Sequence, residues 1–268
     1  MIAILVDEGL SVRRACQVAS LARAAYYRPL QDQVDRDGEI VAALSALVAE
    51  LPQWGFGLCF RHLRIAGHRW NQKRVLRVYR QLRLHLPRRA KKRVPTRVNQ
   101  PLDAPAVLHQ VLAMDFMSNQ LYTGPRFRTM NVLDEGNREG LAVEVAWSFP
   151  AVRVVAILDQ FVAVYGSPDA IRIDNGPEMV SEMLRAWAEQ HRVRLLFIQP
   201  GKPTQNAYIE RFNGTYRKEV LDAYIFGSLA DVRFETEGWL PIYNLRRPHE
   251  SLGGVPPLTY PPRSAVAA

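Results

Sequence analysis

Two acidic residues lie in or directly after short apolar runs. Asp115 interrupts the run 111–117, and an unpaired carboxylate inside such a strand is costly to bury. Asp174 follows the run 170–173, and the Asn-Gly-Pro sequence after it ends that strand. An acid at the carboxyl end of a buried strand points into the crevice where open α/β sheets place their ligands.

A third acid, Glu210, lies in a segment of different character. Residues 206–221 contain no proline, and Pro203 can occupy the first turn of a helix there. Asn206, Asn213 and Gly214 are three or four positions from Glu210 and share its helical face. This face is small and polar, so we expect an open site and not a packed core.

Three acids from two strands and a helix can hold two Mg²⁺ ions about 4 Å apart, the arrangement that supports in-line phosphoryl transfer. Mg²⁺ prefers oxygen ligands and keeps water molecules that can attack a phosphorus atom. Asp115, Asp174 and Glu210 therefore predict a metal-dependent catalytic site.

The sequence around these acids resembles a known family. Asp174 and Glu210 have 35 residues between them, which is the spacing in the acidic triad of retroviral-type integrases and related transposases. Six strings further resemble the second-reading-frame product of the insertion-sequence-three family of bacterial transposases, from about Gly9 to Tyr260. They are MDFMSN, FRTMNVLD, NRE, IRIDNGPE, PGKPTQNAYIERFN and YNLRRPHESLGG.

The resemblance implies a Mg²⁺-dependent transposase, for which Mn²⁺ can substitute, that cleaves and joins the ends of its own element. Asp115, Asp174 and Glu210 would be the catalytic and metal-binding residues. The implied partners are the inverted-repeat ends, target DNA, the product of an upstream frame and further copies of the chain on DNA. The implied contacts to DNA near Glu210 come from Lys202, Asn206, Arg211 and Lys218.

Other titratable residues near this region receive simpler interpretations. Asp134 ends an apolar strand and is interpreted as a turn acid. Glu178 follows Asp174 closely and is interpreted as an acid that stabilises the start of a helix, with contact to a DNA end as the alternative. His109 and His191 have no partner at catalytic spacing in the sequence and are assigned no role.

Positive charge is concentrated in the first hundred residues. Of the net charge of +9, residues 1–100 carry +12 and residues 101–268 carry −3, which indicates that the front half binds a polyanion. Two cysteines, Cys16 and Cys59, are too few for a disulfide framework and indicate a cytoplasmic chain with reduced, buried thiols. No apolar run approaches the length of a membrane span.

Residues 9–30 and 54–86 are each predicted to form a helix-turn-helix segment that binds DNA. In the first, Ser11 and Ser20 are candidate N-caps. The predicted DNA contacts of this segment are Arg23, Tyr27 and Arg28.

The second segment has two helices separated by Gly67, with Asn71 as the cap of the second. Basic residues recur there at helical spacing with no acid among them, which favours phosphate contact over an ordinary charged surface. These residues are Lys73, Arg74, Arg77 and Arg80.

The order of the predicted elements defines the fold class. From residue 107 we expect three antiparallel strands, a helix, a strand, a helix, a strand and a helix. This order is that of the ribonuclease-H-like fold, an α/β fold with a mixed five-stranded sheet. The expected parts are a helical DNA-binding region 1–86, a basic linker 87–100, an integrase-like core 101–225, and a C-terminal helix with a proline-rich tail 226–268.

Two other functions remain compatible with the sequence. A structure-selective nuclease on the same fold would cut DNA but never join it. A non-catalytic regulator would bind DNA through residues 1–100 alone. The intact acids favour the transposase over the regulator, and the helices in residues 1–86 favour it over the nuclease.

The uneven charge yields a prediction about which half binds DNA. When the chain is divided after Asn99, the front piece should bind inverted-repeat DNA and the back piece should bind it weakly. Affinity of the front piece should fall steeply with salt, with a log–log slope of about −0.9 per neutralised phosphate. Titration of both pieces at several salt concentrations measures this, and stronger binding by the back piece would contradict it.

Overall fold

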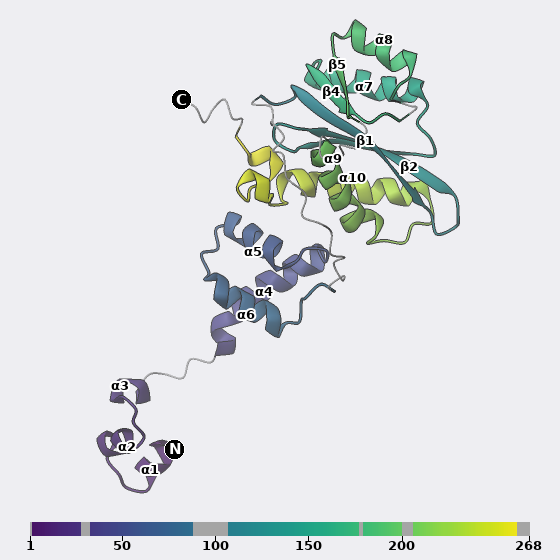
Figure 1. Cartoon of the computed structure of the whole chain (residues 1–268). Coiled ribbons are helices and arrows are strands. Elements are labelled where there is room, and N and C mark those ends of the chain that lie inside the picture. Colours follow the sequence, from purple (N-terminus) through teal and green to yellow (C-terminus); the bar gives the residue numbers. More distant parts are fainter. Residues whose placement is uncertain (1, 28–32, 88–106, 177–178, 200–205, 262–268) are drawn as a thin grey trace.

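The computed structural model describes residues 2–27, 33–87, 107–176, 179–199 and 206–261. Figure 1 shows three parts along the chain: a small N-terminal unit, a helical unit, and a sheet covered by helices on both faces. The expected linker 87–100 falls outside the described residues except for Pro87.

The N-terminal unit consists of the short helices α1 (Ile2–Asp7), α2 (Val12–Val18) and α3 (Arg23–Tyr26). Ser11 precedes α2 as predicted, although its side chain makes no capping hydrogen bond. The prediction for Ser20 is wrong, because α3 is preceded by Ala22 and Ser20 adopts a left-handed conformation in the turn, with φ at 51°.

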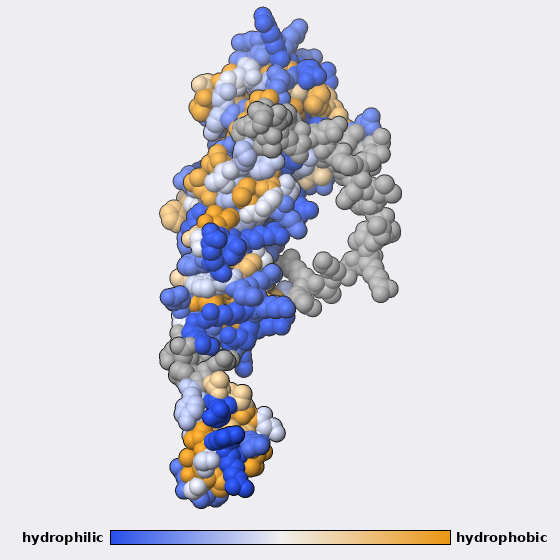
Figure 2. All heavy atoms as spheres, turned by 90° about the vertical axis from the view of Figure 1, so that its left-hand side faces the viewer, coloured by the Kyte–Doolittle hydropathy of each residue, from blue (hydrophilic) through white to orange (hydrophobic). Residues whose placement is uncertain are grey.

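The N-terminal unit buries little of its own apolar surface. Ala15 and Cys16 are buried in α2, whereas Ile4, Val18 and Tyr27 are 60%, 67% and 69% exposed. Figure 2 shows hydrophobic residues on the surface of this unit and mainly hydrophilic residues over the adjoining part of the helical unit.

The helical unit is formed by α4 (Gln33–Glu50), α5 (Phe56–Ile65) and α6 (Gln72–Gln81). Gly67, with φ at 95°, turns the chain between α5 and α6. Asn71 caps α6 as predicted, because its side chain accepts a hydrogen bond from the backbone N–H of Lys73. The three helices share a core that contains Ile40, Leu44, Trp54, Cys59, Val75, Val78 and Tyr79.

The sheet confirms the predicted ribonuclease-H-like fold class. Its five strands have the order β3-β2-β1-β4-β5. The first three pair antiparallel, and β4 pairs parallel with both β1 and β5. The strands are β1 (Val111–Gln120), β2 (Arg126–Asp134), β3 (Gly140–Ala146), β4 (Ala170–Ile173) and β5 (Arg194–Phe197).

Each face of the sheet has its own hydrophobic core, because alternate side chains of a strand point to opposite faces. Helices α7 (Ala151–Tyr165) and α8 (Glu182–Gln190) cover one face. The other face is covered by α9 (Ala207–Tyr216), a π-helical turn (Arg217–Leu221) and α10 (Leu229–Leu245). One hydrophobic core therefore extends across the boundary expected at residue 225, and α10 is a layer of the same unit.

The C-terminal motif around Tyr243 and Asn244 closes the edge of the sheet. The Asn244 side chain accepts a hydrogen bond from the Gly140 N–H (2.9 Å) and donates one to the Gly140 carbonyl (2.8 Å). A Cβ at Gly140 would lie 2.6 Å from the Phe212 ring and 2.8 Å from Leu240. Only glycine fits there without displacement, so β3 approaches α9 and α10 closely.

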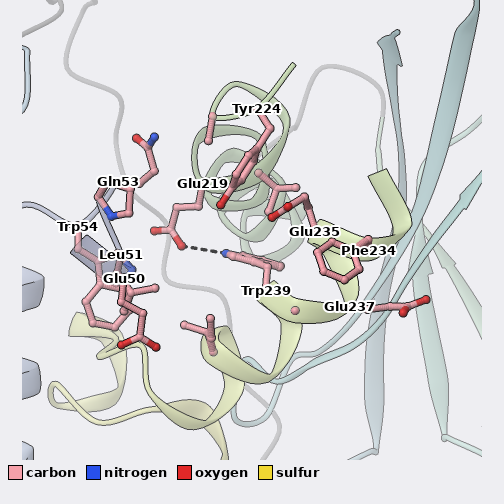
Figure 3. Close-up of a pocket in the computed structure, with 15 residues that line it drawn as sticks. Glu50, Leu51, Gln53, Trp54, Glu219, Tyr224, Phe234, Glu235, Glu237 and Trp239 are labelled. Carbon is pink, nitrogen blue, oxygen red and sulfur yellow. Dashed lines mark hydrogen bonds between the residues drawn. The ribbon is translucent and has the colours of Figure 1, made fainter. Parts of the chain in front are cut away.

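The helical unit contacts the sheet unit through the end of α10. Arg246 forms a bidentate ion pair with Glu50 at the end of α4, one arm of which measures 2.8 Å. Nδ1 of His62 lies 3.1 Å from the Arg246 carbonyl oxygen. Beside these contacts lies a pocket of about 370 Å³ lined by Trp54, Trp239 and their neighbours. In Figure 3 the Trp239 indole points to Glu219, to which it donates a hydrogen bond of 2.9 Å.

Cys16 and Cys59 are free and buried, as predicted. Within the described residues, no helix has both the length and the apolar character needed to cross a membrane.

Candidate active site

Asp115 lies in the middle of β1, the central strand of the sheet, opposite Asn131 of β2. Its Oδ1 accepts a hydrogen bond from the Phe116 N–H (2.8 Å). Its Oδ2 accepts one from the Asn213 side chain of α9 (2.7 Å). Both oxygens of a partly buried carboxylate are thus held by donors that belong to rigid elements.

Asn213 is itself held by a second amide. It is only 7% exposed, and its Oδ1 accepts a hydrogen bond of 2.6 Å from Nδ2 of the fully buried Asn131. The chain of hydrogen bonds from Asn131 through Asn213 to Asp115 joins β2, α9 and β1. Because Asn213 accepts through its oxygen and donates through its nitrogen, the direction of its hydrogen bond to Asp115 is fixed.

Asp174 directly follows β4, which pairs with β1. Its Oδ1 accepts a hydrogen bond of 2.9 Å from the Gly176 N–H, which turns the chain away from the sheet. The neighbouring Asn175 donates a hydrogen bond of 2.9 Å to the carbonyl of Ile198, next to β5. The loop that carries Asp174 is therefore attached to two adjacent strands.

Glu210 lies on the exposed surface of α9, three residues before Asn213. Burial, together with the negative charges of Asp174 and Glu210, raises the pKa of Asp115 to about 6 against the opposing effect of its hydrogen bonds. The two outer carboxylates are thus close enough to act electrostatically on the central one. Such a set of like charges resists full ionisation unless a cation joins it.

The three carboxylates do not form a closed cluster. Among the residues that the structure describes, no three His, Cys, Asp or Glu side chains are close enough together to hold an ion. The chemistry of the three acids nevertheless fits a hard divalent cation, because all three offer carboxylate oxygens.

Two other buried acids have structural partners. Asp134 is fully buried and accepts hydrogen bonds from the N–H groups of His109 (2.8 Å) and Gly136 (2.7 Å), which confirms it as a turn acid. Glu135, for which the sequence suggested no role, pairs with Arg172 of β4 at 2.7 Å. Glu178 lies outside the described residues.

The residues predicted to contact DNA near Glu210 differ in their exposure to solvent. Arg211 and Lys218 are exposed. Asn206 is only 4% exposed, and Asn213 is buried as well. The prediction that these two residues lie on an open helical face is therefore wrong. The apolar neighbours of α9 bring both amides inside the sheet unit. Lys202 falls in a segment outside the described residues.

The predicted contacts on the helical segments also divide into two groups. Arg23, Tyr27, Lys73 and Arg80 are exposed, and Arg28 falls outside the described residues. Arg74 and Arg77 both form ion pairs with Asp37 of α4, at 2.8 and 2.7 Å. The expectation that no acid lies among these cations is therefore wrong, because α4 brings one into the patch.

Sequence reasoning missed the role of Asn131 and gave Asn213 only a surface position. A polar amide in an otherwise apolar strand was the available signal for Asn131, since buried polar groups require partners. For Asn213 the signal was its spacing of three residues from Glu210. Neither signal identifies Asp115 as the shared partner without the pairing of β1 and β2.

Comparisons with known proteins agree with this geometry. The integrase core domain family matches residues 108–203 and, in a second part, residues 191–257. An uncharacterized 39.2 kDa protein of insertion element IS476 from Xanthomonas euvesicatoria is 36% identical over 256 residues, which are 94% of this chain and 72% of that protein. The 31.7 kDa protein of insertion element IS407 from Burkholderia multivorans is 33% identical, over 100% of this chain and 96% of that protein.

Among solved structures, a chain of the simian T-cell lymphotropic virus intasome in complex with PP2A regulatory subunit B56 gamma has a TM-score of 0.50. It is 15% identical, and the match covers 74% of this chain and 69% of that one. This likeness shows the fold.

Sheet order, acid positions and family match together define an integrase-type catalytic core of the ribonuclease-H-like class. The chain belongs to the integrase-core family of insertion-element proteins, and its function is of the transposase and integrase class.

The hydrogen-bond chain to Asp115 predicts a stability change at Asn213. Asn213→Ala would leave Asn131 and the Asp115 carboxylate without a shared partner, so the free energy of unfolding should fall by about 1–3 kcal/mol. Gly214→Ala is the matched control, because nothing lies within 4 Å of the added Cβ and alanine favours a helix by roughly 0.5–1 kcal/mol. Urea unfolding of both variants should show changes of opposite sign; equal stabilities would contradict the role of Asn213.

The raised pKa of Asp115 predicts a pH-dependent stability. Its pKa is about 6 in the folded chain against an ordinary 3.8, so ionisation destabilises the folded state as the pH rises through that window. In buffer with a chelator, Asp115→Asn should be more stable than the wild type at pH 7 by roughly 1–3 kcal/mol. The difference should shrink as the pH approaches 4. Denaturation curves across the window measure it, and a pH-independent difference would contradict the prediction.

Proposed function

We propose that the protein is a transposase of the insertion-sequence-three type. It binds the inverted-repeat ends of its own element, cleaves DNA to free 3′ ends, and joins them to a second DNA strand. The observation that carries this proposal is the position of Asp115. Its carboxylate accepts hydrogen bonds from one backbone N–H and one side-chain amide, and it lies under the electrostatic influence of Asp174 and Glu210.

The residues that would hold the metal are Asp115, Asp174 and Glu210. When bound there, two Mg²⁺ ions, or Mn²⁺ in their place, would lower the pKa of the attacking water or hydroxyl and stabilise the leaving oxygen. The raised pKa of Asp115 supports the assignment, because it marks a set of carboxylates whose repulsion a cation relieves.

The chain's own residues would position the reacting groups. The Phe116 N–H and the Asn213 amide each donate a hydrogen bond to a different oxygen of Asp115. The remaining lone pairs of this carboxylate therefore have a fixed direction. The Gly176 N–H likewise donates to an oxygen of Asp174. Glu210 projects from the surface of α9, next to the exposed cation Arg211. A phosphodiester beside α9 would meet both a carboxylate for the metal and a positive charge for the phosphate.

Partners follow from the same chemistry. The chain would act on DNA as a homo-oligomer, so that the two ends of an element are held together. We further propose that the chain acts with the product of an upstream frame. We also propose that Lys202 and Lys218 contact phosphates of the DNA.

The first test removes one acid and keeps its volume. Asp174→Asn should reduce cleavage and joining of inverted-repeat oligonucleotides in Mg²⁺ by at least about a hundredfold, more than the loss of an outer-sphere partner. Asp169→Asn is the matched control, because Asp169 is exposed and lies just before β4, at the end of the strand away from Asp174. Activity of Asp174→Asn near that of Asp169→Asn would overturn the assignment.

Two further measurements separate the alternatives. Mg²⁺ should raise the melting temperature of the wild type and Asp169→Asn, since a ligand that binds only the folded state stabilises it, but not that of Asp174→Asn. Wild-type protein that cuts the oligonucleotides without joining them would be a nuclease, not a transposase.

A further inference from the structure

A hollow of about 460 Å³ lies between the start of α4 and α6. In Figure 1 these two helices belong to the helical unit and not to the sheet unit, which carries the three acids. The lining of the hollow consists of Arg36 and Asp37 from α4 and Arg74 and Arg77 from α6. Three arginines and one aspartate therefore line a solvent-accessible hollow, and together they carry a net positive charge.

Asp37 engages the two arginines of α6 with separate oxygens. Its Oδ1 accepts a hydrogen bond from Nε of Arg74 at 2.8 Å, and its Oδ2 accepts one from Nη2 of Arg77 at 2.7 Å. Nη2 of Arg74 also donates to the backbone carbonyl of Arg36. Each guanidinium is planar and uses part of its donor set on α4, and Nη1 of Arg77 also donates to Gln81 at 3.4 Å. The direction of each group is therefore fixed, while both still have further N–H groups, since an arginine carries five.

Burial distinguishes the acid from the two arginines. The Asp37 side chain is 7% exposed, whereas the side chains of Arg74 and Arg77 are each 38% exposed. The hydrogen bond from Arg74, helped by Arg77, holds the pKa of Asp37 below its ordinary value, so the acid stays ionised at neutral pH. The carboxylate thus lies beneath the arginines and does not block them from solvent.

A purely structural ion pair explains this arrangement poorly. One arginine would neutralise one buried carboxylate, and an apolar pair could join α4 to α6 equally well. Here two arginines, three positions apart on α6, share one acid. Fixed guanidinium groups with remaining donors are suited to phosphate, which they bind through paired hydrogen bonds.

We propose that this hollow binds a phosphate of the duplex DNA backbone and that Asp37 is a positioning residue that orients Arg74 and Arg77 toward it. The inference rests on the proposed DNA-binding function and adds to it: an acid in the basic half of the chain strengthens DNA binding. The sign of this effect is opposite to that expected from charge alone.

The test compares two variants of the full chain that each remove one negative charge from α4. Glu39 is exposed, two residues after Asp37, so Glu39→Gln should leave affinity for duplex DNA unchanged or raise it slightly. Asp37→Asn should lower that affinity about tenfold, because the guanidinium groups lose their charged anchor. It should also reduce the magnitude of the log–log salt slope by about one. Fluorescence anisotropy with a short labelled duplex measures both quantities.

A second pair of measurements covers a folding defect. Circular dichroism should show the same helical content for both variants. If Asp37→Asn loses helix, Arg77→Lys decides the matter, because it keeps the charge and the ion pair but removes the planar donor set. In the wild-type chain, Arg77→Lys should weaken binding severalfold. Where Asp37→Asn keeps its helix, Arg77→Lys in that background should weaken binding much less.

Affinity of Asp37→Asn equal to or above that of Glu39→Gln would overturn the proposal, as would Arg77→Lys with wild-type affinity. The assay reads binding, not joining. A chain that binds DNA with this contrast but joins no ends would therefore contradict the proposed transposase activity and leave the phosphate site standing.

Discussion

A partly buried carboxylate in the central strand is the constraint on which the catalytic unit depends. Asp115 needs donors, and the sheet itself supplies one, the Phe116 N–H. The other must come from outside the strand, and α9 supplies it through Asn213. Because Glu210 lies one helical turn before Asn213, the hydrogen bond that satisfies the first acid also places the third. One interaction therefore fixes the relative positions of two acids that are far apart in the sequence.

The position of α9 depends in turn on the C-terminal helix, which contributes none of the three acids. Trp239 of α10 packs against the rings of Phe212 and Tyr216, with centroids 5.5 and 5.2 Å away. The absence of a side chain at Gly140 lets β3 lie against the same group. The close packing leaves α9 little room to slide along the sheet, since protein interiors adapt poorly to displaced volume. The C-terminal motif is thus part of what positions Glu210.

The sequence predicted those features that depend on local pattern. Apolar runs located the strand that contains Asp115 and the strand before Asp174, and the Asn-Gly-Pro sequence placed Asp174 at a strand end. Features that depend on tertiary neighbours were not accessible. Helical spacing grouped Asn213 with Glu210, but only the pairing of β1, β2 and α9 shows that Asn213 is buried against Asp115. Asp37 lies 37 positions from Arg74, so the helical pattern of α6 alone could not reveal the acid among its cations.

Charge has different roles at two places: the hollow between α4 and α6, and the contact between the helical unit and the sheet unit. Arg246 and Glu50 join α10 to α4, but their side chains are 36% and 50% exposed, and such surface pairs contribute only about 0–1 kcal/mol. The contact between the two units depends more on apolar packing, because Ile242 of α10 packs against the hydrophobic core of the helical unit that contains Trp54. Salt screens exposed charges but leaves apolar contacts intact. High salt should therefore release DNA from the basic residues of α6, while the helical unit remains packed against the sheet unit.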